Sequence, residues 1–380
     1  MFTRRQFLKI ASLSYASLAF AGPASQNTSR KTLILIELRG GNDSLNSLIP
    51  IQSRQYRKLR PNLAVSEKEA LGLSDGLALH PKLKFLRQAF SAQKATAIMG
   101  LGYPQPNRSH FRSIEIVETG SDSQDDWTDG WCSRLIRAGV QGDVADGIVI
   151  RSPELGTLNG SALKVLSLRG SDQLQKPGRG KLREDSLQNP ALKHVLGVQN
   201  DLLQMSRELA GRVKPLPRDS FPKGRFGEDI KTTCEILEAQ LNIPVIRLTL
   251  GGFDTHTSQM KRHERLMEEL DLGLSALMEF LKSHGLESKA MIATYSEFGR
   301  RPQENQQGGT DHGTAASHFL LGQGVPPRLF GKMPSLEDLL EENLKHEITW
   351  RSYWQALAET SFGIGTRLFP EFEDAPLKLI

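Results

Sequence analysis

The 380-residue sequence predicts an α/β fold: a doubly wound, mainly parallel sheet with flanking helices. Apolar, strand-like runs alternate with amphipathic helical segments, and this order is typical of a parallel sheet. The run Thr32–Leu38 is apolar at nearly every position, as expected for a strand buried on both faces. Short polar clusters follow several such runs. Because ligands bind outside the carboxyl ends of parallel strands, these clusters predict one site at that edge of the sheet.

The first part of the domain begins after a lead-in at 22–31, which is rich in Ser, Thr and Asn and is expected to be flexible. Apolar residues at helical spacing predict helices, and short continuous apolar runs predict strands. In chain order these are a strand at 32–38, a helix at 81–91, a strand at 95–99, a helix at 109–118 and short strands at 146–150 and 162–167.

The middle of the chain, about 151–225, predicts an inserted helical and loop cap on the sheet scaffold. Residues 168–188 are rich in Gly, Lys, Arg, Asp and Gln without clear periodicity, so we expect an exposed loop there. Amphipathic helices are predicted at 191–210 and 226–241, on either side of the Pro-rich stretch 214–222.

The alternation resumes after the insertion and completes a single predicted α/β domain over 32–380. Continuous apolar runs again mark strands, and the helical segments between them are long and amphipathic. The predicted elements are strands at 244–250, 289–295 and 318–321 and helices at 258–283 and 350–360.

The N-terminus has the parts of a secretory signal peptide over residues 1–21. The stretch Thr3–Lys9 holds the pair Arg4 and Arg5 followed by Phe-Leu-Lys, then an uncharged stretch and the small-x-small sequence Ala19-Phe-Ala21. The arginine pair predicts the twin-arginine (Tat) export machinery as a partner and a periplasmic or secreted location. The alternative is an ordinary N-terminal helix.

Charge and composition exclude some classes of function. The net charge of +5 falls to +2 without Arg4, Arg5 and Lys9, and no Lys/Arg run indicates a nucleic-acid surface. No segment after the leader is long and apolar enough to predict a membrane span. The cysteines, Cys132 and Cys234, could pair in an oxidising compartment or remain buried free thiols.

The polar clusters after the strands supply carboxylates and imidazoles, the donors that divalent cations use. Alone, each cluster is ordinary, because an Asp-x-His is more often a turn with a surface histidine. Asp254 and His256 are two residues apart, so in an extended segment both side chains face the same way. Mixed Asp, Glu and His ligation suits Zn, Mn or Mg, and Ca is a further option. The candidate metal ligands are Asp43, Asp254, His256, Glu297, Asp311 and His312.

A candidate nucleophile stands at the predicted start of the helix at 109–118. Ser109 would lie where helix N–H groups favour a phosphate or sulfate, although an N-cap role alone also explains a serine there. His110 could be a metal ligand, an oxyanion contact or a packing residue. Arg108, Arg300 or Arg39 could bind anionic oxygens through paired hydrogen bonds. The segment Trp127–Trp131 is more typical of packing than of a site.

Five motifs occur together in one order: Arg-Gly-Gly-Asn-Asp (39–43), Gly-Tyr-Pro-x-Pro-x-Arg-Ser-His-Phe (102–111), Gly-Gly-Phe-Asp-Thr-His (251–256), Ser-Glu-Phe-Gly-Arg (296–300) and Gly-Thr-Asp-His-Gly (309–313). This series resembles the bacterial family called domain of unknown function 1501. That family is similar in fold to the alkaline phosphatase superfamily, which includes sulfatases and cofactor-independent phosphoglycerate mutases. The resemblance implies a site for two metal ions and a Ser or Thr nucleophile at the start of a helix.

Carried over to this sequence, the resemblance implies a role for each matching residue. Asp43 matches the metal aspartate after the first strand, Ser109 the nucleophile, and His312 the late metal histidine. Asp254 and His256 look like the acid and the histidine of one metal site. Ser296 and Glu297 stand where the superfamily usually has an Asp-His pair, so one expected imidazole is replaced and the second metal is in doubt.

Two functions follow as hypotheses. The first is an exported metal-dependent hydrolase of phosphate or sulfate esters with Ser109 as nucleophile. The second is a non-catalytic, metal-binding periplasmic protein on the same fold that acts in envelope assembly or as a scaffold, because fold does not determine function.

Overall fold

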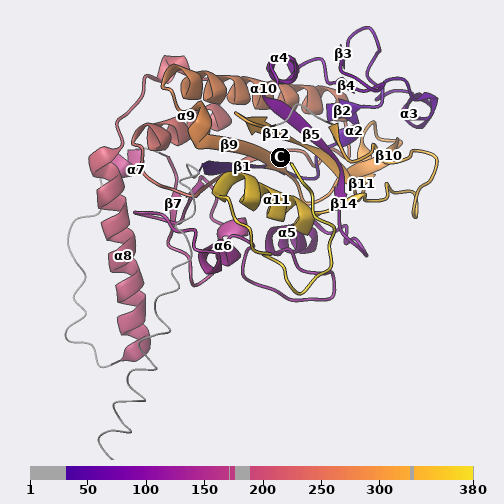
Figure 1. Ribbon diagram of the computed structural model, residues 1–380. Helices are drawn as coiled ribbons and strands as arrows, with labels where there is room; N and C mark the ends of the chain where they lie inside the picture. The colour runs from indigo at the N-terminus through magenta and orange to yellow at the C-terminus, as the bar shows by residue number, and fades with distance from the viewer. Residues whose placement is uncertain (1–30, 171, 176–188, 326–328, 380) are drawn as a thin grey trace, which may run out of the picture.

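The computed structural model describes residues 31–379, with gaps at 171, 176–188 and 326–328 (Figure 1). The predicted signal peptide, nearly all of the lead-in and most of the loop at 168–188 lie outside the described residues. In the described part of the chain, no helix has the length and apolar character that a membrane span needs.

The centre of the molecule is a nine-stranded sheet, as the apolar runs predict. Strand β1 pairs in parallel with β8 and β9, and only β12 runs against its neighbours β5 and β9. Across the sheet the order is β13 (Leu329–Phe330), β5 (Ala95–Gly102), β12 (Ala316–Gly322), β9 (Ala290–Tyr295), β1 (Thr32–Arg39), β8 (Val245–Gly251), β6 (Gly147–Ile150) and β7 (Val165–Leu168), and β14 (Ile348–Thr349) also pairs with β5.

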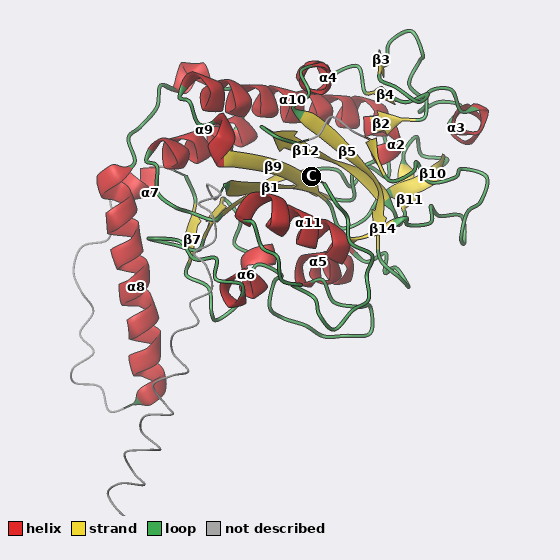
Figure 2. Ribbon diagram, in the orientation of Figure 1, coloured by secondary structure: helices red, strands yellow, loops and turns green. Residues whose placement is uncertain are grey.

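Helices cover both faces of this sheet (Figure 2). One face carries α4 (Lys84–Ser91), α9 (Arg225–Glu238) and α10 (Gln259–Ser283), and the other carries α5 (His110–Thr119), α6 (Ser133–Arg137) and α11 (Trp350–Phe362). The predicted doubly wound, mainly parallel α/β fold is therefore confirmed.

The residues of β1 show why this strand is apolar throughout. Ile34 and Ile36 point into the core under α4, α9 and α10, whereas Leu33 and Leu35 point into the core under α5 and α11. All four side chains are completely buried. Successive side chains of a strand face opposite sides of the sheet. A strand between two helical layers therefore needs apolar residues at both its odd and its even positions.

Smaller elements surround the sheet. The stretch 151–225 adds the edge strand β7 and the helix α8, which packs on the core through Met205 and Leu209.

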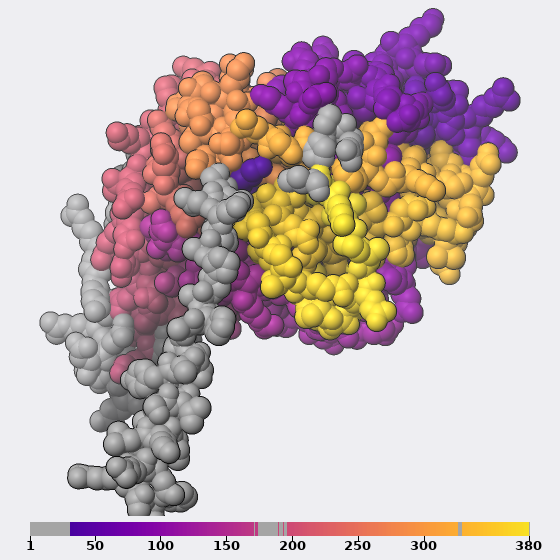
Figure 3. Space-filling model, in the orientation of Figure 1, coloured from indigo at the N-terminus to yellow at the C-terminus, as the bar shows by residue number. Residues whose placement is uncertain are grey.

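The last third of the chain occupies the middle of the face seen in Figure 3. The remaining elements are α2 (Ser44–Ser47), α3 (Arg54–Leu59), α7 (Asp172–Gln175), α8 (Pro190–Arg212), the sheet β2 (Leu48–Ile49), β4 (Ala78–Leu79) and β3 (Leu71–Gly72), the hairpin β10 (Arg300–Glu304) and β11 (Thr310–His312), and the turns η1 (Gly156–Leu158), η2 (Arg218–Ser220) and η3 (Glu287–Lys289).

The two cysteines do not form a disulfide. Cys132 and Cys234 are both buried free thiols, and they belong to the cores on opposite faces of the sheet. Trp131 is also completely buried and stacks on Trp354 of α11, with 5.1 Å between ring centroids. This places Trp131 in the core, as its spacing from Trp127 indicated.

Candidate metal centre

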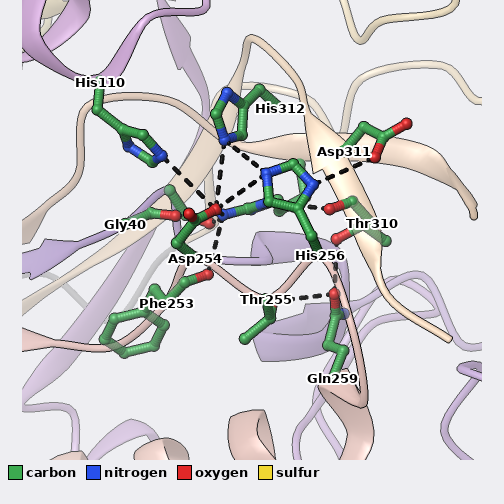
Figure 4. Close-up of polar contacts among 12 residues, drawn as sticks. Gly40, His110, Phe253, Asp254, Thr255, His256, Gln259, Thr310, Asp311 and His312 are labelled. Carbon is green, nitrogen blue, oxygen red and sulfur yellow. Dashed lines mark hydrogen bonds and ion pairs between the residues drawn. The ribbon is translucent and has the colours of Figure 1, made fainter. Parts of the chain in front are cut away.

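Four polar segments meet beyond the carboxyl ends of the central strands. The chain after β8 carries Asp254 and His256, and the chain after β9 carries Glu297. Helix α5, which follows β5, begins with His110, and the hairpin strand β11 ends with His312. Figure 4 shows His110, Asp254, His256 and His312 directed toward one another. The sheet therefore gathers residues that lie up to about two hundred positions apart in the sequence.

Three imidazole Nε2 atoms surround one carboxylate oxygen. The Oδ1 atom of Asp254 lies 3.1 Å from Nε2 of His256, 3.3 Å from Nε2 of His312 and 3.5 Å from Nε2 of His110. The Nε2 atoms of His256 and His312 are 2.9 Å apart. His110, Asp254 and His312 offer ligand atoms that all lie within 4.8 Å of one another, close enough to share one ion.

Each of these rings is held from behind by an acceptor on its other nitrogen. Nδ1 of His256 lies 3.2 Å from Asp311 Oδ1, and Nδ1 of His312 lies 2.8 Å from the carbonyl oxygen of Arg108. Nδ1 of His110 lies 2.7 Å from Glu297 Oε1. Carbonyl and carboxylate oxygens only accept hydrogen bonds, so we assign the Nδ1 proton to each neutral ring, which leaves Nε2 with a free lone pair.

The residues present fit a bound cation. Ligand atoms about 2.0–2.1 Å from a tetrahedral Zn²⁺ are separated by about 3.3 Å, and the separations around Asp254 are close to this value. Two Nε2 lone pairs facing each other at 2.9 Å also repel unless a cation or proton lies between them. In addition, Nε2 of His110 is buried without a hydrogen-bond partner among the described residues.

Asp254 is held in its charged form. Partial burial would raise its pKa, but the hydrogen bond and the charge of Arg300 lower the pKa to about 2. Arg300 Nη2 donates to Asp254 Oδ1 at 2.6 Å. The pKa of His312 is lowered from its ordinary value, mainly by burial, and this favours the neutral ring that ligation requires.

Arg300 does not have the position predicted for a residue that binds an anionic substrate. Its side chain is completely buried, and it donates to the backbone carbonyls of Gly40, Gly41, Phe253 and Thr310 as well as to Asp254. A guanidinium with these partners has no donors directed to solvent. Arg300 therefore positions Asp254 and the loop after β1.

Glu297 lies behind the ring of His110 and outside the candidate ligand group. Its carboxylate is 2% exposed, and Oε1 accepts from Nδ1 of His110 and from the backbone N–H of Gly40. Burial opposes the charged form, but the hydrogen bonds from His110 and Ser296 outweigh it and lower the pKa of Glu297. The hydrogen bond to Glu297 raises the pKa of His110. Asp311 has the matching position behind His256.

Asp43 forms its own buried ion pair and lies outside the candidate ligand group. Both it and Arg60 are almost fully buried, and Oδ2 of Asp43 accepts from Arg60 at 2.7 Å and from Gln259. Burial would raise the pKa of Asp43, but Arg60 lowers it below its ordinary value. Arg60 and Gln259 both bind Oδ2, whereas Oδ1 is buried without a hydrogen-bond partner among the described residues. Asp43 is not part of the ligand group of His110, Asp254 and His312.

Ser109 occupies the N-cap position of α5, next to the ligand group. Its side chain makes no capping hydrogen bond and is exposed, so capping does not account for the serine. Its neighbours are part of the site, because His110 carries a candidate ligand atom and the carbonyl of Arg108 holds His312. The Arg108 side chain is exposed.

Sequence reasoning left one role open and missed two residues. The role of His110 was undecided, and the structure brings it into the ligand group with Asp254 and His312. Arg60 and Gln259, which bind Asp43, were not identified. No short motif marks Arg60, since it lies just beyond α3 in a polar stretch far from the strands.

The fold and this cluster define an α/β protein with a candidate metal centre at the carboxyl edge of a mainly parallel sheet. The chain belongs to the family described as Protein of unknown function (DUF1501), whose model matches residues 30–347. No curated protein sequence matches the chain.

Several solved structures resemble the chain weakly. A sulfatase, PsFucS1 from Pseudoalteromonas sp., is 10% identical with a TM-score of 0.42, and the match covers 95% of this chain and 72% of that one. The C-terminal periplasmic domain of EcEptC from Escherichia coli, in complex with Zn, is 8% identical with a TM-score of 0.44, over 91% and 88%. A phosphonate monoester hydrolase of Agrobacterium radiobacter is 10% identical with a TM-score of 0.41, over 87% and 74%. Likenesses at this level carry no conclusion about activity.

Proposed function

We propose that this protein is an exported, metal-dependent hydrolase of phosphate or sulfate esters. The observation that carries the proposal is the convergence of three Nε2 atoms on Asp254, each ring fixed through Nδ1, beside an uncapped serine at a helix N-terminus. His110, His312 and Asp254 would hold the ion, and His256, whose Nε2 lies 3.1 Å from Asp254 Oδ1, would be a fourth ligand. Three imidazoles and one carboxylate favour Zn²⁺ over the oxygen-preferring Ca²⁺ and Mg²⁺.

The chain's own residues account for the rest of the chemistry. A bound divalent ion supplies positive charge for the ester oxygens. Ser109 would attack the phosphorus or sulfur atom, the bond to the alcohol would break, and water would then hydrolyse the ester on the serine. The N–H groups at the start of α5 favour an anion at this position. The exposed side chain of Arg108 could bind a remaining ester oxygen.

The test is metal analysis combined with assays of an aryl phosphate and an aryl sulfate. Purified protein should contain a near-stoichiometric divalent metal, and Asp254→Ala or His312→Ala should lose it. Ser109→Ala should keep the metal but lose at least a hundredfold in turnover, whereas Ser74→Ala, a change at an exposed serine outside the site, should leave both unchanged. Unchanged turnover in Ser109→Ala would overturn the nucleophile assignment.

A second candidate function is non-catalytic metal binding in envelope assembly or as a scaffold. The ion pair between Asp43 and Arg60 favours it, because the carboxylate implied for a second metal is already neutralised. One ligand group of at least three His, Cys, Asp or Glu residues is found in the described ranges. If the purified protein contains stoichiometric metal but turns over neither the aryl phosphate nor the aryl sulfate, this non-catalytic function is supported over the hydrolase.

We also propose export through the twin-arginine pathway, on the evidence of Arg4 and Arg5 and the short apolar stretch that follows them. Changing both arginines to lysine should leave the protein in the cytoplasm of the native host. Cell fractionation measures this. Periplasmic or secreted protein in the double variant would refute the route.

A further inference from the structure

A cavity of about 730 Å³ opens directly beside the candidate metal centre. His110 and Glu297 are among its lining residues, together with the turn Pro153–Gly156 and further residues of α5. A group joined to an ester held at the metal centre would therefore enter this cavity. Its size suits a small organic group, since ligand pockets usually measure about 300–1,000 Å³.

Carboxylates outnumber cationic groups on the cavity wall. Arg39 and Arg112 are the guanidinium groups that line it. Both are already paired, Arg39 with Glu37 and Glu154, and Arg112 with Glu115 and Asp126. An anionic group would meet guanidinium ions whose charge is already balanced. The lining carboxylates are Glu37, Glu115, Glu118, Asp126, Glu154 and Glu297.

Two of the lining carboxylates, Glu37 and Glu118, belong to a buried polar network. Arg247 is fully buried and donates to Glu37 at 2.8 Å and to Glu118 at 2.9 Å. Burial raises the pKa of Glu118 to about 7, and carboxylates remain in excess on the wall when this group is protonated. Gly156 is needed beside this network because a Cβ there would lie 2.4 Å from Oε1 of Glu118.

Aromatic side chains complete the wall. Phe111 lines the cavity and is 82% exposed, although it follows His110 directly. Trp127 lines another part of the same wall. An exposed phenylalanine gives a bound cation a ring face to contact. Rings combined with carboxylates are the usual surroundings of bound ammonium groups.

We propose that this cavity binds a protonated amine carried by the alcohol part of the substrate. The inference rests on the proposed hydrolase function and adds to it a substrate class, esters whose leaving alcohol bears an ammonium group. The lining holds more carboxylates than guanidinium groups, so the cavity keeps a net negative charge that attracts the ammonium group even with Glu115 and Glu154 paired to arginines, and Phe111 contacts it through its ring.

The experiment measures binding of three product-like phenols to the intact, metal-loaded protein by calorimetry. The phenols carry aminomethyl, hydroxymethyl or carboxylate groups at the para position, so they differ in charge at nearly constant shape. The aminomethyl phenol should bind about fivefold more tightly than the hydroxymethyl phenol, and the carboxylate phenol most weakly. Phe111→Ala, Glu115→Gln and Glu154→Gln should each reduce the preference. Glu268→Gln, which changes an exposed carboxylate on α10, is the matched control.

The corresponding phenyl phosphates separate this inference from the proposed function. If all three esters are turned over at rates that do not follow their charge, and the three phenols bind equally, the amine site is refuted and the proposed hydrolase function is retained. If the aminomethyl phenol binds selectively but no ester is turned over, the cavity assignment is supported and the proposed hydrolase function is refuted. A preference that persists in all three cavity variants places amine binding elsewhere and overturns the inference.

Discussion

At the scale of single residues, the orientation of His110 depends on Glu297, which holds Nδ1 from behind. We predict that Glu297→Gln reduces metal affinity by about 10- to 100-fold, because an uncharged acceptor fixes the ring and its proton less well. Competition with a coloured chelator measures this affinity. Glu287→Gln, at a partly exposed glutamate outside the site, is the control. Equal affinities in the two variants would remove Glu297 from the metal centre.

His318 gives a second prediction, on stability. It is completely buried on β12, and burial lowers its pKa to about 3. The unfolded chain binds this proton below about pH 6.5 while the folded protein does not, so stability is lost as the pH falls from that value toward 3. The loss from this group is about 2 kcal/mol at pH 5.

Urea unfolding of the wild type and His318→Leu at pH 7 and pH 5 checks this. The variant should lose less stability between the two pH values than the wild type, whatever its stability at pH 7. Equal losses in both proteins would show that His318 titrates normally in the folded state.

Part of the site could be predicted residue by residue. Asp254 and His256 follow the strand-like run of β8, so their positions at the sheet edge follow from the pattern alone. His312 ends the hairpin strand β11, which has no such run. The positions of Asp43 and Glu297 outside the ligand group could not be predicted in this way. They depend on Arg60 and His110, partners 17 and 187 residues away in the sequence. Charge pairing at such separations leaves no periodic signal.

At the scale of elements, the loop after β1 passes so close to the loop after β8 that only glycine fits. Gly40 has φ +117°, and a Cβ on it would lie 2.3 Å from the backbone nitrogen of Asp254. We predict that Gly40→Ala costs about 2 kcal/mol or more of unfolding free energy and weakens metal binding, because the two loops must separate.

Denaturant unfolding and chelator competition measure both effects. Gly72→Ala is the matched control, since no atom lies within 4 Å of a Cβ at Gly72. That variant should keep the wild-type midpoint and metal affinity. If Gly40→Ala behaves like Gly72→Ala, the close approach of the loops does not shape the site.

The central strands and the long helices were predictable as elements, whereas the hairpin β10–β11 was not. Strands such as β1 and β9 are buried on both faces and therefore have continuous apolar sequences. The hairpin strand β10 reads Arg-Arg-Pro-Gln-Glu and has no such run. It is held by hydrogen bonds to other loops, and these partners cannot be recognised from local sequence.

At the scale of the whole molecule, the candidate centre joins segments from separate parts of the fold. A metal bound only by the folded protein should therefore stabilise all of it by mass action. At a metal concentration a hundredfold above Kd the gain is about 2.7 kcal/mol, which for a domain of this size raises Tm by roughly 4 °C. Scanning calorimetry with and without chelator measures it. Asp254→Ala should show no shift, and a shift of wild-type size would place the ion elsewhere.

The buried side chain of Arg300 has a kinetic consequence. This single guanidinium binds carbonyl groups from the loop after β1, the loop after β8 and the hairpin, and the hairpin also carries His312. Arg300 is the first residue of the hairpin, so an opening of the hairpin would break its bonds to Gly41, Phe253 and Asp254 together. We therefore expect an ion bound by His312 and Asp254 to leave at the opening rate of the hairpin, so that a site with modest equilibrium affinity would still exchange its metal slowly.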